Sequence, residues 1–100
     1  MRRAVITGLG IVSCLGNDRE SVTKSLREGI SGIRRREDFV EMGLRCHVGA
    51  VLDIDPKEHI DRKVLRFMGA SASYAYIATD RAIADAGLSE DMVSNPRTGL

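Results

Sequence analysis

Residues 2–16 read RRAVITGLGIVSCLG, an apolar run near the start of the chain that glycines interrupt. Its two apolar pieces, Ala4 to Ile6 and Leu9 to Leu15, are rich in β-branched residues. Continuous runs of this kind are typical of a strand that is covered on both faces of an α/β sheet. We therefore expect a buried opening strand, in which Gly8 and Gly10 mark close packing or a bulge.

Thr7, Gly8 and Gly10 in the same run could also belong to a phosphate-binding loop. A dinucleotide fingerprint needs the spacing G-x-G-x-x-G between a strand and a helix, and Ser13 stands where the third glycine belongs. The chain also stays apolar through Leu15 instead of entering a helix after Gly10. The spacing thus favours an architectural strand over a nucleotide site.

The composition is that of a globular protein, with 100 residues, of which 43% are hydrophobic and 29% charged. A net charge of +1 argues against general attraction to nucleic acid or to an anionic membrane, because both need a basic excess. The sequence has no apolar run of about 20 residues, and its first residues lack the apolar h-region that is typical of a signal peptide. Cys14 and Cys46 lack metal-ligand spacing, which predicts reduced thiols and a cytoplasmic location.

The first half of the chain predicts one clear helix. Asn17 is the expected N-cap, with Glu20 at capping-box spacing, and the helix is expected over about 18–28 with Gly29 as its C-terminal stop. Residues 31–55 show no sustained period. We expect an irregular connection there, with a short strand at Cys46 to Leu52.

The second half predicts an amphipathic turn from Ile60 and a long helix over 70–86 that Gly87 ends. A one-turn helix is expected from Ser89, and a new strand at Thr98 to Leu100. One face of the long helix is expected to form the packing stripe, which consists of Ala72, Ala75, Tyr76, Thr79, Ala82, Ile83 and Ala86. Since the chain ends where a strand is starting, we expect a fragment that does not fold alone.

The cysteines and histidines make weak catalytic candidates. Cys14 lies in an apolar strand without a neighbour that would lower its pKa, so a buried, inert thiol is expected. The pair 46–47 places a thiol beside an imidazole, but adjacent strand residues point to opposite faces. His59, near Glu58 and Asp61, would need further ligands to hold a metal and is interpreted as a surface histidine.

Two cationic clusters differ in their surroundings. Arg34 to Arg36 is followed at once by two acids and is expected to be a solvated loop. In residues 60–68, by contrast, Arg62, Lys63 and Arg66 fall within about one quadrant of a helical wheel. The apolar residues lie on the opposite side, with Ile60 and Phe67 at its flanks. Spacing alone leaves an ordinary solvated helix face and a docking surface for an acidic partner equally open.

Five pieces of the sequence resemble the N-terminal part of β-ketoacyl-acyl-carrier-protein synthases, most nearly the bacterial synthase I type. They occur in the order found in that family and together span the chain nearly end to end. Residues 34–58 match more loosely. The pieces are RRAVITGLGIVSCLGN (2–17), SLREGISGI (25–33), IDRKVLRFM (60–68), AIADAGLS (82–89) and NPRTGL (95–100).

The resemblance implies an α/β, thiolase-like fold with α-β-α-β-α layers, of which residues 1–100 would be the first, incomplete part of the N-terminal half. It implies decarboxylative condensation of an acyl thioester with malonyl-acyl-carrier protein in type II fatty acid synthesis. The reactive cysteine and two histidines of the family lie downstream of this segment, so no catalytic residue is expected here.

The resemblance also implies a homodimer and no bound cofactor, because the phosphopantetheine arm belongs to the carrier. Arg62, Lys63 and Arg66 match basic positions that contact the acidic recognition helix of acyl carrier protein, so the resemblance tips the balance toward docking. Two alternatives stay open. One is a catalytically inactive partner of the same fold, of the chain-length-factor type, and the other a nucleotide-binding oxidoreductase.

Overall fold

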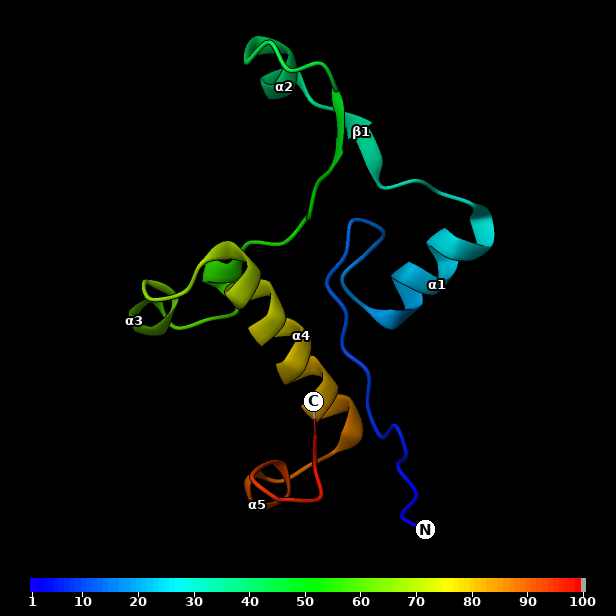
Figure 1. The fold of residues 1–100 in the computed structure, drawn as a ribbon, viewed down its shortest axis with the longest axis vertical. Helices are drawn as coiled ribbons and strands as arrows, with labels where there is room; N and C mark the ends of the chain where they lie inside the picture. The colour runs from blue at the N-terminus through cyan, green and yellow to red at the C-terminus, as the bar shows by residue number, and fades with distance from the viewer. Residues whose placement is uncertain (100) are drawn as a thin grey trace. The chain divides into compact units, whose positions relative to one another are not determined.

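The structure is a computed structural model that describes residues 1–99 (Figure 1). These residues divide into two compact units, residues 1–12 with residues from 55 onward, and residues 13–54. Each unit is described by itself. In chain order the elements are α1 (Arg19–Glu28), β1 (Ile33–Arg35), α2 (Glu37–Glu41), β2 (Val48–Ala50), the 3₁₀ helix η1 (Pro56–Glu58), α3 (Arg62–Leu65), α4 (Ala70–Ala86) and α5 (Glu90–Val93).

In the first unit, the N-terminal segment lies directly against α4. A Cβ atom on Gly8 would meet the carbonyl oxygen of Ala82, and one on Gly10 would meet that of Ala78. The Leu9 amide donates a hydrogen bond of 3.0 Å to Oδ2 of Asp85. The expected close packing at the two glycines is confirmed, since only a residue without a side chain fits there.

The predicted opening strand is not found in the structure. Residues 1–12 carry no strand assignment, and Figure 1 draws them as a plain trace. A strand needs a neighbouring strand with which to share backbone hydrogen bonds. Among the described residues this segment lies against helix α4, whose backbone groups are already paired within the helix. The predicted burial of this segment is also wrong, since Val5 and Ile6 are 79% and 93% exposed.

Helix α4 confirms the predicted long helix with the same bounds. Gly87 ends it in the left-handed conformation, with φ of 65°, and its amide donates to the carbonyls of Ala84 and Ile83. The predicted packing stripe is wrong in the first half of the helix, whereas Ala82 and Ala86, in its second half, lie against Gly8 as a packing stripe would. Ser73 and Ile77 are the buried positions, while Ala72, Ala75 and Tyr76 are exposed. Because alanines occur on several faces of this helix, the side chains differ little in size from face to face. The sequence therefore could not show which face is buried.

The predicted one-turn helix after Ser89 is confirmed as α5. The strand predicted at Thr98 to Leu100 is not found at Thr98 and Gly99, and Leu100 lies outside the described residues. The Thr98 side chain instead donates to the carbonyl of Met92, at 2.7 Å, which closes the segment back onto α5.

In the second unit, helix α1 is confirmed and ends at Gly29 as expected, but its cap lies one residue later than predicted. Asp18, not Asn17, is the N-cap, and its carboxylate accepts hydrogen bonds from the amide and hydroxyl of Ser21, each at 2.8 Å. The predicted spacing to Glu20 therefore does not form a capping box. A carboxylate at this place also faces the positive end of the helix dipole.

Residues 31–55 are more ordered than predicted. Strands β1 and β2 pair antiparallel, with Ile33 opposite Ala50 and Arg35 opposite Val48, and α2 lies between them in the chain. The predicted strand at 46–52 is confirmed in its central residues as β2. The expected loop at Arg34 and Arg35 is wrong, because both belong to β1.

The isolated segment is expected not to fold cooperatively. Among residues 1–99 the buried hydrophobic side chains are Ile60 and Ile77, which is too small a core to offset the loss of chain entropy. Near-UV circular dichroism of residues 1–100 should be weak, and its thermal trace broad. A sharp two-state transition with coincident probes would contradict this expectation.

Candidate functional site

The turn that carries the basic cluster is built from two short helices in the first unit. Asp55 caps η1 by accepting the Lys57 amide at 3.0 Å, and Asp61 caps α3 by accepting the Lys63 amide at 2.7 Å. Ile60, between them, is only 5% exposed and anchors the turn. The predicted amphipathic turn from Ile60 is confirmed, and its position is set by these caps and this anchor.

Arg62, Lys63 and Arg66 all lie on the exposed side of this turn, which we call the basic turn. Arg62 and Lys63 open α3, and Arg66 is its C-cap. Within residues 1–99, no carboxylate forms an ion pair with any of the three. Three cations on a fixed backbone thus keep their charge available for a partner.

The arginine run 34–36 behaves differently. Arg36 forms two hydrogen bonds to the carboxylate of Asp38, at 2.8 and 2.6 Å, and Arg35 pairs with Glu37 at 2.7 Å. The hydrogen bond from Arg36 lowers the pKa of Asp38 below its ordinary value. Two of the three arginines in this run are neutralised by neighbouring acids, so it makes a poorer docking surface than the basic turn.

Cysteines and histidines form no reactive constellation in the part of the chain described. Cys14 is half-buried and Cys46 exposed, and both are free thiols. The thiol of Cys46 contacts the carbonyl of Val48, at 3.4 Å, rather than an imidazole. No group of three His, Cys, Asp or Glu side chains in residues 1–99 is placed to hold a metal ion, and His59 is exposed.

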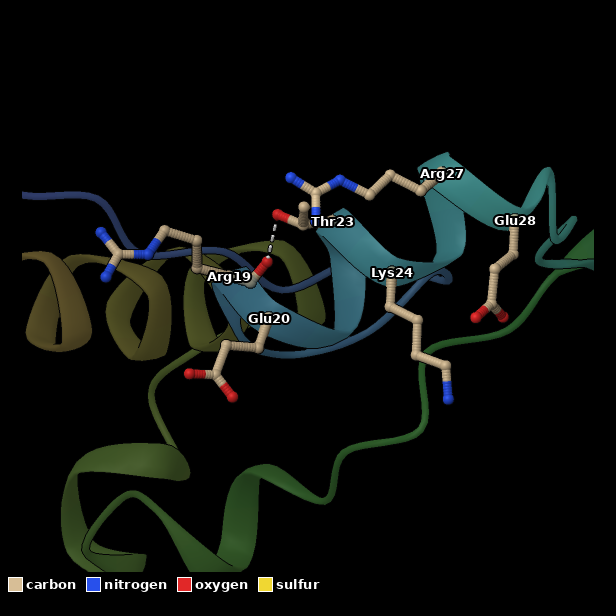
Figure 2. Close-up of a pocket in the computed structure, with 6 residues that line it drawn as sticks. All are labelled: Arg19, Glu20, Thr23, Lys24, Arg27 and Glu28. Atoms are coloured by element: carbon tan, nitrogen blue, oxygen red, sulfur yellow. Dashed lines mark hydrogen bonds between the residues drawn. The ribbon is translucent and has the colours of Figure 1, made fainter.

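A hollow on the surface of α1 is also lined by several charged side chains. Figure 2 shows its six side chains directed outward from one helix, with the hydroxyl of Thr23 donating to the carbonyl of Arg19 at 2.6 Å. Its acids and bases alternate at helical spacing, as on an ordinary solvated helix face. The lining residues are Arg19, Glu20, Thr23, Lys24, Arg27 and Glu28.

The glycine run does not form a phosphate cradle. At Gly8 and Gly10 the space that a pyrophosphate would need is occupied by the backbone of α4.

Of the helices that the structure describes, none combines the length and apolar character that a bilayer crossing demands.

Comparison with known proteins assigns the family. The sequence model described as "Beta-ketoacyl synthase, N-terminal domain" matches residues 1–100. The chain belongs to the β-ketoacyl synthase family. The resemblance stated from five sequence pieces is thereby confirmed.

Curated members of the synthase family match over the entire chain. It is 58% identical to 3-oxoacyl-[acyl-carrier-protein] synthase 1 of Haemophilus influenzae and 52% identical to the enzyme of the same name from Escherichia coli. In both cases the chain spans 25% of the relative's length.

A solved β-ketoacyl synthase shares the fold. The crystal structure from Burkholderia phymatum STM815 matches 91% of this chain and 23% of its own, with a TM-score of 0.78 and 34% identity. This similarity supports the thiolase-like fold class expected from the sequence.

The structure also shows that one aromatic side chain of the basic turn, Phe67, is exposed beside the cations. Phe67 is 78% exposed, and the guanidinium of Arg66 lies over its ring at 4.6 Å from the centroid. Helical spacing predicted a flanking position but could not show that α3 ends at Leu65 and leaves the ring in solvent.

Proposed function

We propose that residues 1–100 form the N-terminal segment of a 3-oxoacyl-[acyl-carrier-protein] synthase of type II fatty acid synthesis. The names of the relatives and the end-to-end match support this proposal. In the complete protein, this segment would open the layered α-β-α-β-α arrangement. The catalytic cysteine and two histidines would come from outside this segment.

The reaction follows from general chemistry. A cysteine thiolate takes the acyl group from its carrier by thioester exchange, releasing the carrier thiol. Malonyl-carrier protein then loses carbon dioxide, and the resulting carbanion attacks the acyl-enzyme thioester. The carbon–carbon bond forms as the carbon–sulfur bond breaks, which returns the cysteine thiolate. Hydrogen-bond donors must stabilise negative charge on the thioester oxygen at both stages.

Within this reaction, we assign the basic turn to carrier docking. The observation that carries the assignment is the set of three exposed cations, Arg62, Lys63 and Arg66, without an ion-pair partner in residues 1–99. A carrier protein presents its acyl chain on a long arm beside an acidic helix. Opposite charges would orient the carrier and speed the encounter more than they would add affinity.

The proposal extends to a homodimer in the cytoplasm. The free thiols of Cys14 and Cys46 support a reducing compartment. Light scattering on the full-length protein tests the oligomeric state, with a mass of two chains as the expected result.

The activity is tested by supplying the full-length protein with acyl-carrier and malonyl-carrier proteins. Carbon dioxide release should match the formation of a 3-oxoacyl product one malonyl-derived unit longer than the acyl substrate. Carrier binding without either product would assign the protein to the catalytically inactive class instead. Tight binding of NAD(P)H would support the alternative interpretation as a nucleotide-binding oxidoreductase.

A further inference from the structure

Phe67 is the most exposed aromatic ring near a charged surface in the described chain, and its place there is fixed by the backbone. Its amide donates to the carbonyl of Val64, at 3.1 Å, in the last turn that closes α3. Leu65 and Met68, on either side of the Arg66–Phe67 pair, are half-buried. The turn thus directs Leu65 and Met68 partly inward, whereas Val64 is 45% exposed and Phe67, at 78%, is the most exposed of its apolar side chains.

The ring is stacked with a cation whose charge remains available. The Arg66 guanidinium lies 4.6 Å from the Phe67 ring centroid, within the range of a cation–π contact. A second stack in the chain, Arg36 over Phe39 at 5.1 Å, has a different character, because Arg36 is also held by the carboxylate of Asp38. In the basic turn, aromatic surface and unneutralised charge are both presented outward.

This combination matches the composition of protein interfaces. Aromatic and arginine side chains are enriched at the centres of such interfaces, where burial of apolar surface slows dissociation. Surrounding charges mainly speed association. A purely electrostatic docking surface has no need of an exposed phenylalanine.

We propose that Phe67 is an apolar anchor within the basic turn. It packs against an apolar side chain that the acidic helix of the carrier protein presents next to its carboxylates. The inference rests on the proposed docking function and adds a second kind of contact to it. The charges of Arg62, Lys63 and Arg66 set the rate of encounter, and Phe67 sets the lifetime of the complex.

The test compares dissociation constants for the full-length protein and an acyl carrier protein whose acyl chain is held by a non-hydrolysable amide. Phe67→Ala is expected to raise Kd about tenfold, which corresponds to about 1.4 kcal/mol. This factor should persist from about 50 mM to about 500 mM salt, because apolar burial is not screened. The increase should appear mainly in the dissociation rate.

Three variants make the result specific. Phe67→Leu keeps apolar volume and should recover most of the affinity. Phe67→Gln, which replaces the apolar ring with a polar side chain, serves as the test if Phe67→Ala does not fold. Tyr76→Ala, at an exposed aromatic position on α4, is the matched control and should leave Kd unchanged. Turnover of a carrier-free acyl-pantetheine thioester reports whether each variant retains its active site.

The inference and the proposed function fail in different ways. A Kd within about twofold of the parent for Phe67→Ala, while Lys63→Glu still weakens binding, overturns the anchor and leaves the docking function in place. Loss of the Phe67→Ala effect in an Arg66→Ala background also overturns it, since the ring would then act only by holding Arg66. If neither Phe67→Ala nor Lys63→Glu changes Kd, the docking function fails as well.

Discussion

Combining Lys63→Glu with Arg66→Glu in the full-length protein is expected to raise the apparent KM for carrier-bound substrate about 10- to 100-fold at low salt. Each reversal replaces an attraction to the acidic helix with a repulsion of similar size. Both positions are exposed and without an ion-pair partner among residues 1–99, so the fold should tolerate the change. At saturating carrier concentration, kcat should stay near the parent value because no catalytic residue is altered.

The salt dependence separates docking from damage. Screening shortens the Debye length from about 30 Å at 0.01 M to about 3 Å at 1 M, so the difference between parent and variant should shrink steadily with salt. Combining Lys24→Glu with Arg27→Glu on α1 makes the same change in net charge at positions that already lie among acids and bases, and should leave KM unaltered. Unchanged turnover of carrier-bound substrate at low salt in the double variant would reject the docking assignment.

Gly10→Ala is expected to destabilise the full-length protein by about 3 kcal/mol or more. The new methyl group would overlap the carbonyl oxygen of Ala78 and approach the amide nitrogen of Ala82. These are backbone atoms of a helix and cannot rotate away as a flexible side chain would. The N-terminal segment would have to leave α4, and its hydrogen bond from Leu9 to Asp85 would be lost.

Soluble yield and the apparent melting temperature measure this effect. Gly99→Ala is the matched control, since a Cβ atom there meets nothing within 4 Å. The control should melt within about 2 °C of the parent, whereas Gly10→Ala should give a much lower temperature or an insoluble protein. Equal melting of the two variants would show that the segment does not pack on α4 as closely as described.

Local sequence signals predicted the helices well. The bounds of α4, the C-terminal stops at Gly29 and Gly87 and the short α5 follow from backbone preferences that act over a few residues. The N-cap of α1 was misplaced because Asn17 and Asp18 are both good caps, and periodicity does not choose between neighbours.

Features that depend on distant partners were the ones that sequence patterns missed. β1 has the sequence Ile-Arg-Arg, which lacks an apolar period and becomes a strand only through its pairing with β2. The opening run has strand composition, yet α4 lies beside it in the described residues. The three cations of the basic turn were predicted from spacing, but the exposure of Phe67 depends on where α3 ends.

The contact between the N-terminal segment and α4 also sets an order of events during synthesis. Leu9 and Asp85, which share a hydrogen bond, are 76 residues apart in the chain. At a translation rate of about 5–20 residues per second, the apolar run emerges roughly 4–15 s before the helix that receives it. During that interval the Leu9 amide has no acceptor at Asp85 and Gly8 and Gly10 have no helix to pack against, so the segment can dock only after α4 has been synthesised.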